Sequence, residues 1–289
     1  MLAQYIDMTN EAYHAHEAIG ASMIETFRHS RREYHARYIA KTEPPKESPA
    51  MAFGTLVHLL VLEPELAESR IADPFPDVAP DGKKWLRRKG SDHEKWWQEE
   101  LDKREGMLQC DAEDLQRARD CVAAIKDNEK AAAFFARKGK PEYSIFWTDA
   151  ASGLACKCRV DWMSSVAVDL KTTRDATPAE YAKQLVQLGY ARKKAHYEAG
   201  LRALFGDKAP PFIHIAVESV APHRVANYEL DDRDKEGYSL GEGQRRTLLH
   251  WIAKCMESGD WREPWERKPI TLQLPSWAFH EDSYQFSGE

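Results

Sequence analysis

Two neighbouring stretches in the middle of the chain alternate between apolar and polar residues, and this alternation constrains the fold more than any other feature. The runs LACKCRVDWM (154–163) and VAVDL (166–170) place apolar side chains at every second position, which is the period of a half-buried β-strand. Because only Ser164 and Ser165 separate the runs, we expect an antiparallel hairpin. We predict that Asp161, Asp169 and Lys171 share its polar face, with Asp161 close to Asp169 across the ladder.

The other predicted elements place this hairpin in a mixed α/β fold. A third strand is expected before the hairpin at 142–148, and two more strands are expected at 212–220 and 224–230. Helices are expected at 21–40, 50–62, 111–138 and 232–255, and another is expected to begin at 177, run toward Gly189 and resume to Leu204. We therefore predict a mixed central sheet flanked by helices. A single domain is expected, with a mainly helical part (1–138), an αβ core (139–260) and a C-terminal tail (261–289).

Charge and cysteine content argue against several classes of protein. A net charge of -6 disfavours a protein that coats nucleic acid indiscriminately, although an enzyme with a local basic groove stays compatible with it. Five cysteines without a CxxC pair argue against a disulfide framework, a zinc ribbon and an iron–sulfur site. No apolar run is long enough to span a bilayer, and the first residues lack the pattern of a secretory signal. We expect a cytoplasmic protein without membrane contact.

The three polar residues of the hairpin suggest metal-assisted chemistry. Two carboxylates held close together repel each other unless a cation neutralises them, and Mg²⁺ prefers oxygen ligands. Such a cation can lower the pKa of a water molecule, while Lys171 positions the nucleophile or stabilises the charge on a phosphate. The pattern therefore suggests phosphodiester hydrolysis. The same spacing also fits a cross-strand ion pair at a solvated edge, and short patterns of this kind recur by chance.

Six short motifs favour the enzyme over the ion pair. In chain order they are NEAYHA (10–15), FGTLVH (53–58), EYSIFW (142–147), CKCRVD (156–161), VDLKTT (168–173) and AVESVAP (216–222). In sequence, order and spacing they resemble the RecE (exonuclease VIII) branch of the PD-(D/E)XK nuclease superfamily. The resemblance implies a restriction-endonuclease-like core with an added N-terminal helical region, in one nuclease domain over 1–289.

The resemblance also implies roles for individual residues. It makes Lys171, Asp161, Asp169 and His58 catalytic, and Asp161, Asp169 and His58 metal ligands. From the residues alone, a single histidine on an apolar helix is more often a core residue than a ligand. Gly54, one turn before His58, would let a strand approach the helix closely. The implied cofactor is Mg²⁺, with Mn²⁺ as a substitute.

The implied activity is that of an exodeoxyribonuclease. It would degrade linear double-stranded DNA from its ends, 5′ to 3′, and leave single-stranded overhangs for recombination. The resemblance implies a phage or prophage protein in a bacterial host cell, a ring-shaped homo-oligomer such as a tetramer, and a single-strand annealing partner of the RecT type. Two alternatives stay open: a RecB-like endonuclease or repair nuclease, and a catalytically weak DNA-binding or assembly subunit with the nuclease fold.

Further candidates lie near the motifs. Glu142, Gln184, Gln187 and Tyr190 are candidate site residues; for Glu142 we favour an ion pair with Arg159 over a role as ligand. Candidate DNA contacts are a set of cations and one aromatic ring, namely Lys83, Lys84, Trp85, Arg87, Arg88, Lys89, Arg159, Arg192 and Lys193. A solvated helix face explains the basic run at 83–89 equally well. Lys193 stands where the family has glutamine, and lysine can reach a phosphate but cannot accept a hydrogen bond.

Overall fold

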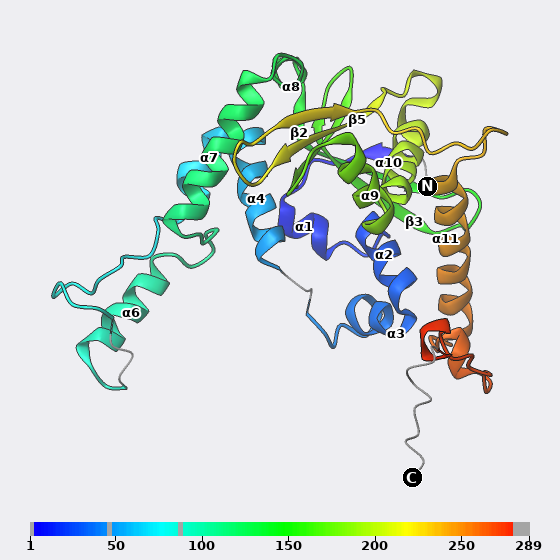
Figure 1. Ribbon diagram of the computed structural model, residues 1–289, viewed down its shortest axis with the longest axis horizontal. Helices are drawn as coiled ribbons and strands as arrows, with labels where there is room; N and C mark the ends of the chain where they lie inside the picture. Colours follow the sequence, from blue (N-terminus) through cyan, green and yellow to red (C-terminus); the bar gives the residue numbers. More distant parts are fainter. Residues whose placement is uncertain (1–2, 45–47, 86–88, 280–289) are drawn as a thin grey trace, which may run out of the picture.

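A six-stranded mixed sheet forms the centre of the computed structural model, which describes residues 3–44, 48–85 and 89–279 (Figure 1). The strands lie side by side in chain order, and only β4 and β5 run parallel. They are β1 (Gln4–Tyr5), β2 (Lys140–Thr148), β3 (Ala155–Met163), β4 (Ala167–Thr173), β5 (Phe212–Glu218) and β6 (Val225–Tyr228). The predicted mixed sheet and its three-strand meander are confirmed, and β1 is an addition that no residue pattern indicated.

The helices agree with the expected segments but break at more points. They are α1 (Asn10–Ala15), α2 (Ala21–His29), α3 (Arg31–Tyr34), a π-helix (His35–Ile39), α4 (Pro49–Leu62), α5 (Ala67–Arg70), α6 (Asp92–Asp102), α7 (Ala112–Asp127), α8 (Glu129–Phe135), α9 (Pro178–Gln187), α10 (Tyr190–Phe205) and α11 (Leu240–Ser258), with 3₁₀ turns at Pro64–Leu66, Gly206–Lys208, Pro264–Glu266 and Ser276–Phe279. The expected helix at 21–40 is interrupted because Ser30 is extended and caps α3. Likewise Asn128 ends α7 and caps α8.

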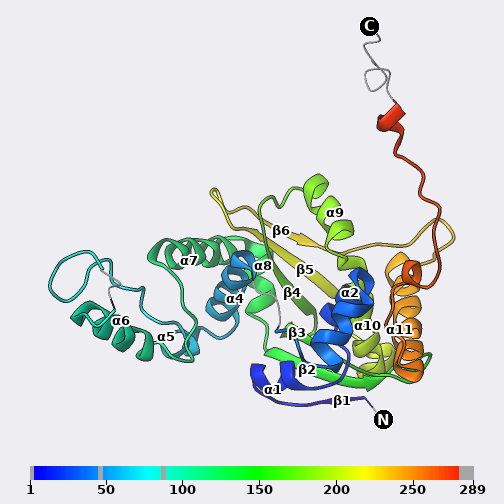
Figure 2. The ribbon, with the colours of Figure 1, turned by 90° about the horizontal axis from the view of Figure 1, so that it is seen from below.

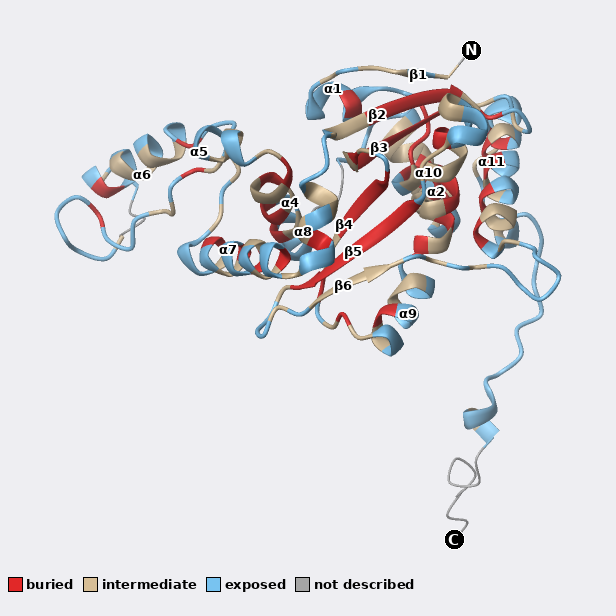
Figure 3. Ribbon diagram, turned by 90° about the horizontal axis from the view of Figure 1, so that it is seen from above, coloured by how far each residue is buried: buried red, intermediate tan, exposed pale blue. Residues whose placement is uncertain are grey.

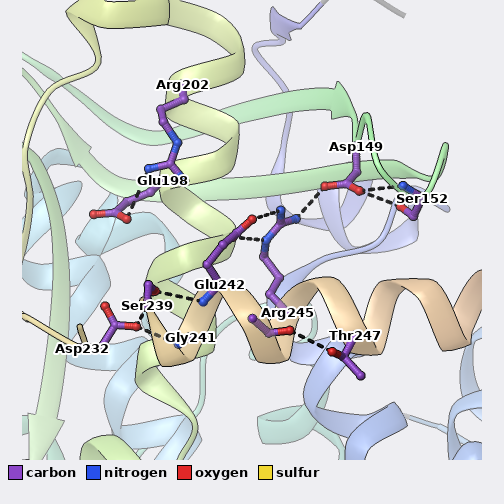
Figure 4. Close-up of polar contacts among 11 residues, drawn as sticks. Asp149, Ser152, Glu198, Arg202, Asp232, Ser239, Gly241, Glu242, Arg245 and Thr247 are labelled. Atoms are coloured by element: carbon purple, nitrogen blue, oxygen red, sulfur yellow. Dashed lines mark hydrogen bonds and ion pairs between the residues drawn. The ribbon is translucent and has the colours of Figure 1, made fainter. Parts of the chain in front are cut away.

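Two starts of helices differ from the expectation. Residues 177–180 (TPAE) have the sequence of a capping box, but the Thr177 side chain makes no capping hydrogen bond at the start of α9, so this expected box does not form. The last helix begins at Leu240 instead of 232, because the carboxylate of Asp232 accepts from the Gly241 amide and the Ser239 hydroxyl and so holds a turn (Figure 4).

Helices cover both faces of the sheet, and each face has its own hydrophobic core (Figures 2 and 3). Helices α2, α10 and α11 cover one face, where the buried residues include Ile145, Cys156, Cys158, Val160, Leu201 and Ile252. Helices α4 and α7 cover the other, with Leu56, Val57, Val168, Leu170 and Ile215. Cys156 and Cys158 thus lie in the core, as their alternation predicted.

A buried polar network ties α11 to the turn between β2 and β3. Arg245 donates to Asp149 over 2.8 Å and also pairs with Glu242, and the second Asp149 oxygen accepts from the amide and hydroxyl of Ser152 (Figure 4). Because Arg245 and Asp149 are both buried, each charge is compensated inside the protein.

Two segments project from this body (Figures 1 and 2). A lobe around α6 extends from the ends of α5 and α7, and the segment after α11 leaves the opposite side with Leu272 and Trp277 exposed. Among the described residues, no single helix has the length and apolar character to cross a membrane. By length and composition, only α4 and the following helical segment Pro64–Arg70 would together be long and apolar enough, and this pair is bent by 110°.

Candidate active site

The polar residues of the hairpin meet in a fork between β3 and β4. The ladder between these strands contains Trp162↔Val168 and Met163↔Ala167, and the next step would pair Asp161 with Asp169. Instead, the Asp161 carboxylate accepts a hydrogen bond from the amide of Leu170 over 2.7 Å. Asp161 and Asp169 lie close to each other, as predicted, because the charge of Asp169 acts on Asp161, but they do not form a ladder pair. A carboxylate takes the place of a backbone acceptor, and the strands separate around the charged groups.

His58 reaches this fork from α4. The helix packs on β4 near Gly54, where a Cβ atom would make an ordinary van der Waals contact of 3.4 Å with the Thr172 hydroxyl oxygen. His58 Nε2 lies 2.8 Å from the Leu170 carbonyl oxygen, and Nδ1 lies 3.9 Å from Asp161 Oδ2. Since a carbonyl can only accept, Nε2 is the donor, which in a neutral imidazole leaves the lone pair of Nδ1 beside Asp161.

Glu142 from β2 lies close to both of these residues. One ligand atom from each of His58, Glu142 and Asp161 lies within 4.8 Å of the other two. Burial and the Asp161 charge raise the pKa of Glu142 to about 7, and burial together with Asp169 raises the pKa of Asp161. Both carboxylates therefore have raised pKa values, and both lie next to a lone pair of the imidazole. A divalent cation fits such a set of donor atoms.

Asp169 and Lys171 form the other side of the fork. Lys171 Nζ lies 2.5 Å from Asp169 Oδ2 and donates to the Leu170 carbonyl. Although burial lowers it, the pKa of Lys171 is raised above its usual value by Asp169 and Asp161, so the amine stays protonated. His214 Nε2 lies 3.7 Å from the same Asp169 oxygen, and its other ring nitrogen meets the Tyr181 hydroxyl. Sequence reasoning missed His214, because nothing in its buried strand distinguishes it from a core residue.

Comparisons with known proteins show the family and the fold of the chain. Residues 20–264 match the model of a family described as a PDDEXK-like domain of unknown function (DUF3799). The chain belongs to this PDDEXK-like family. Its fold is also similar to the crystal structure of a "Putative exonuclease" from Eubacterium rectale, with a TM-score of 0.59 and 14% identity, covering 93% of this chain and 96% of that one. A comparison with curated proteins finds no significant match.

The remaining candidate site residues of this PDDEXK-like chain lie along α9 and α10. Lys171 Nζ and Lys193 Nζ stand 5.9 and 4.9 Å from the centre of the Tyr190 ring, so Lys193 lies next to the fork. Burial and the charge of Lys171 lower the pKa of Lys193. Gln184 accepts a hydrogen bond from Thr173 at the end of β4, whereas Gln187 is exposed.

Two predicted DNA contacts have internal roles instead. Arg159 is buried under the N-terminal segment, where it donates to Ser144, Asn10 and the carbonyls of Met8 and Thr9. Arg192 is also buried and binds Glu25 and Gln244. Neither guanidinium is directed to solvent, so these two predictions are corrected. The alternation of the strand could not reveal this, because the acceptors come from distant parts of the PDDEXK-like chain.

The described residues of the basic run, 83–85 and 89, belong to the projecting lobe. Trp85 donates to the Pro76 carbonyl and packs against Phe75 and Trp97, so its ring helps to hold the lobe together. Lys83, Lys84 and Lys89 are exposed, and Lys83 pairs with Asp81. Arg87 and Arg88 lie outside the described residues. The alternative of a helix face does not hold for Lys83, Lys84 and Trp85, which lie before α6.

Proposed function

We propose that this protein is a metal-dependent nuclease that hydrolyses phosphodiester bonds of DNA. The observation that carries the proposal is the fork itself. Carboxylates and an imidazole that fit a divalent cation lie beside a half-buried, protonated lysine. This combination suits a reaction in which an anionic phosphate gains further negative charge.

Each residue of the fork has a distinct task in this proposal. Asp161, Asp169 and His58 hold the cation, Mg²⁺ in the first place and Mn²⁺ as a substitute, and once bound it supplies a water of lowered pKa and positive charge beside the phosphate. Lys171 donates to a phosphate oxygen, and Asp169 orients its amine through the 2.5 Å contact. His214 and Tyr181 hold Asp169 in place from behind.

We infer further that the substrate is the end of linear double-stranded DNA, degraded 5′ to 3′. The resemblance to the RecE branch supports this, and so does the likeness in fold to a protein named as an exonuclease. From the same resemblance we propose a ring-shaped homo-oligomer, a RecT-type annealing partner and a role in phage-type recombination. Lys193 would hold the DNA backbone close to the fork.

The test is a comparison of linear and closed circular duplexes. We expect Mg²⁺-dependent release of nucleotides from 5′-labelled linear DNA, no release with EDTA, and no attack on the circle. Asp161→Asn and Lys171→Met should each abolish release. Lys183→Met is the matched control, because Lys183 is exposed on α9 and pairs only locally with Glu180.

The outcomes separate the alternatives. Cutting of the circle at the rate of the linear duplex would favour the endonuclease. Release that persists in both Asp161→Asn and Lys171→Met would refute catalysis in the fork. A wild-type protein that binds DNA but releases nothing with either cation would favour the non-catalytic assembly subunit.

A further inference from the structure

Glu142 has a backbone conformation that its residue type disfavours. Its φ angle is +50°, in the left-handed region, although it stands inside strand β2. The pairs on either side, Pro141↔Trp162 and Tyr143↔Val160, are intact, so the distortion is confined to this residue and to its partner position, Asp161. Side chains with a Cβ atom are strained in this region, and such strain persists where the surrounding structure imposes it.

The distortion is accompanied by an unfavourable electrostatic environment. The Glu142 side chain is 28% exposed and lies next to the Asp161 carboxylate, which is almost fully buried. The two carboxylates therefore stand close together where little water reaches them. A position chosen only for stability would avoid a second carboxylate here.

The ion pair with Arg159 does not remove this conflict. Arg159 Nη1 lies 3.6 Å from Glu142 Oε2, too far for a good hydrogen bond. Its guanidinium donates instead to Ser144, Asn10 and the backbone of the N-terminal segment. The expected pairing therefore exists as a long contact, and it leaves the charges of Glu142 and Asp161 incompletely balanced.

We propose that Glu142 is a direct ligand of the divalent cation, together with His58 and Asp161. This inference rests on the proposed function and deepens it, because it adds a ligand from β2 to the aspartates of the hairpin. The three side chains come from β2, β3 and α4, and their ligand atoms already lie within 4.8 Å of one another. A cation at this point neutralises both carboxylates and accepts the lone pair of the imidazole.

The first test measures binding of Mn²⁺ to the DNA-free protein, by calorimetry and by the electron paramagnetic resonance signal of free Mn²⁺. Glu142→Gln keeps the size of the side chain and removes its charge. We expect its Kd for Mn²⁺ to rise at least tenfold. The matched control is Glu63→Gln, because the Glu63 charge also acts on Glu142 but Glu63 is not among the three ligands. It should change the Kd less than threefold.

A second variant distinguishes a ligand from a structural residue. Glu142→Gly tolerates a positive φ and removes the carboxylate that faces Asp161. We expect the metal-free variant to unfold at a higher temperature than the wild type while its Kd for Mn²⁺ rises at least tenfold. A residue needed only to hold Arg159 would lower the unfolding temperature and leave the Kd unchanged.

The results separate this inference from the proposed function. If the wild type binds Mn²⁺ and cuts DNA while Glu142→Gln and Glu142→Gly bind it equally well, Glu142 is not a ligand and the nuclease proposal stands. If the wild type neither binds Mn²⁺ nor cuts DNA, both proposals fail together.

Discussion

Acid should destabilise this protein through His196, a buried histidine in α10. His196 Nε2 lies 3.1 Å from the Ile19 carbonyl and 3.0 Å from the Lys157 carbonyl, and thus joins α10 to both the N-terminal segment and β3. Nε2 must donate to these carbonyls, and Nδ1 is buried without a hydrogen-bond partner. A proton on Nδ1 would therefore be placed in a site without an acceptor. Burial, reinforced by the charge of Arg245, lowers the pKa of His196 to about 4.

The size of the effect follows from the two pKa values. In the unfolded chain the histidine has a pKa of 6.5, and the lower pKa of about 4 in the folded protein corresponds to about 3 kcal/mol. Between pH 6.5 and 4 the unfolded state binds more protons than the folded state. The stabilisation is thus fully present above pH 6.5 and is lost as the pH falls toward 4.

The assay is urea unfolding at half-unit steps from pH 7.5 to 4, for the wild type and for His196→Gln. Glutamine can still donate to both carbonyls but does not titrate. We expect the free energy of unfolding of the wild type to fall by about 3 kcal/mol more than that of the variant over this range. His250→Gln, which removes an exposed imidazole from α11, controls for the loss of a histidine as such. Parallel pH curves for the wild type and His196→Gln would refute the reasoning.

Two further predictions concern α10 and its neighbours. Lys193→Met should weaken binding of linear duplex DNA about tenfold and reduce the salt dependence of binding by about one counterion, while the Mn²⁺ affinity stays unchanged. The control variant Lys183→Met should change neither the DNA affinity nor its salt dependence. Equal DNA affinities of the wild type and Lys193→Met would argue against a phosphate contact at Lys193. Gly241→Ala should lower the free energy of unfolding by about 3 kcal/mol in urea, because its Cβ atom would collide with the backbone oxygen of Ala191. A variant as stable as the wild type would show that α10 and α11 separate easily.

The sequence predicts the parts of the fold that depend on local periodicity. Alternation at Cys156, Cys158 and Val168 locates two strands and their core faces, since one side chain in two must avoid water. The motif around His58 correctly brings the imidazole to β4, but the contact does not depend on Gly54, where a Cβ atom would find ordinary van der Waals space.

Features set by contacts between distant residues could not be predicted. Arg159 alternates with Asp161 along the strand, which suggested a cation that faces solvent. Its guanidinium instead donates to the backbone carbonyls of Met8 and Thr9, which lie far away along the chain and could not be foreseen. The left-handed conformation of Glu142 has no signal in its residue type, because glutamate rarely adopts it. β1 is too short to show a period.

The short ladder between β3 and β4 has a mechanical consequence. The strands β3 and β4 share two residue pairs, whereas β2 with β3 and β4 with β5 are joined along most of their length. In addition, the hydrophobic cores on the two faces draw mainly on different halves of the sheet. Sheets open where the fewest bonds must break, so slow native-state fluctuations should concentrate along this seam. Asp161 lies on one side of the seam and His58, packed on β4, on the other. A ligand that binds both residues would link the two halves of the sheet into one cooperative unit. Amide exchange should then slow across the whole sheet.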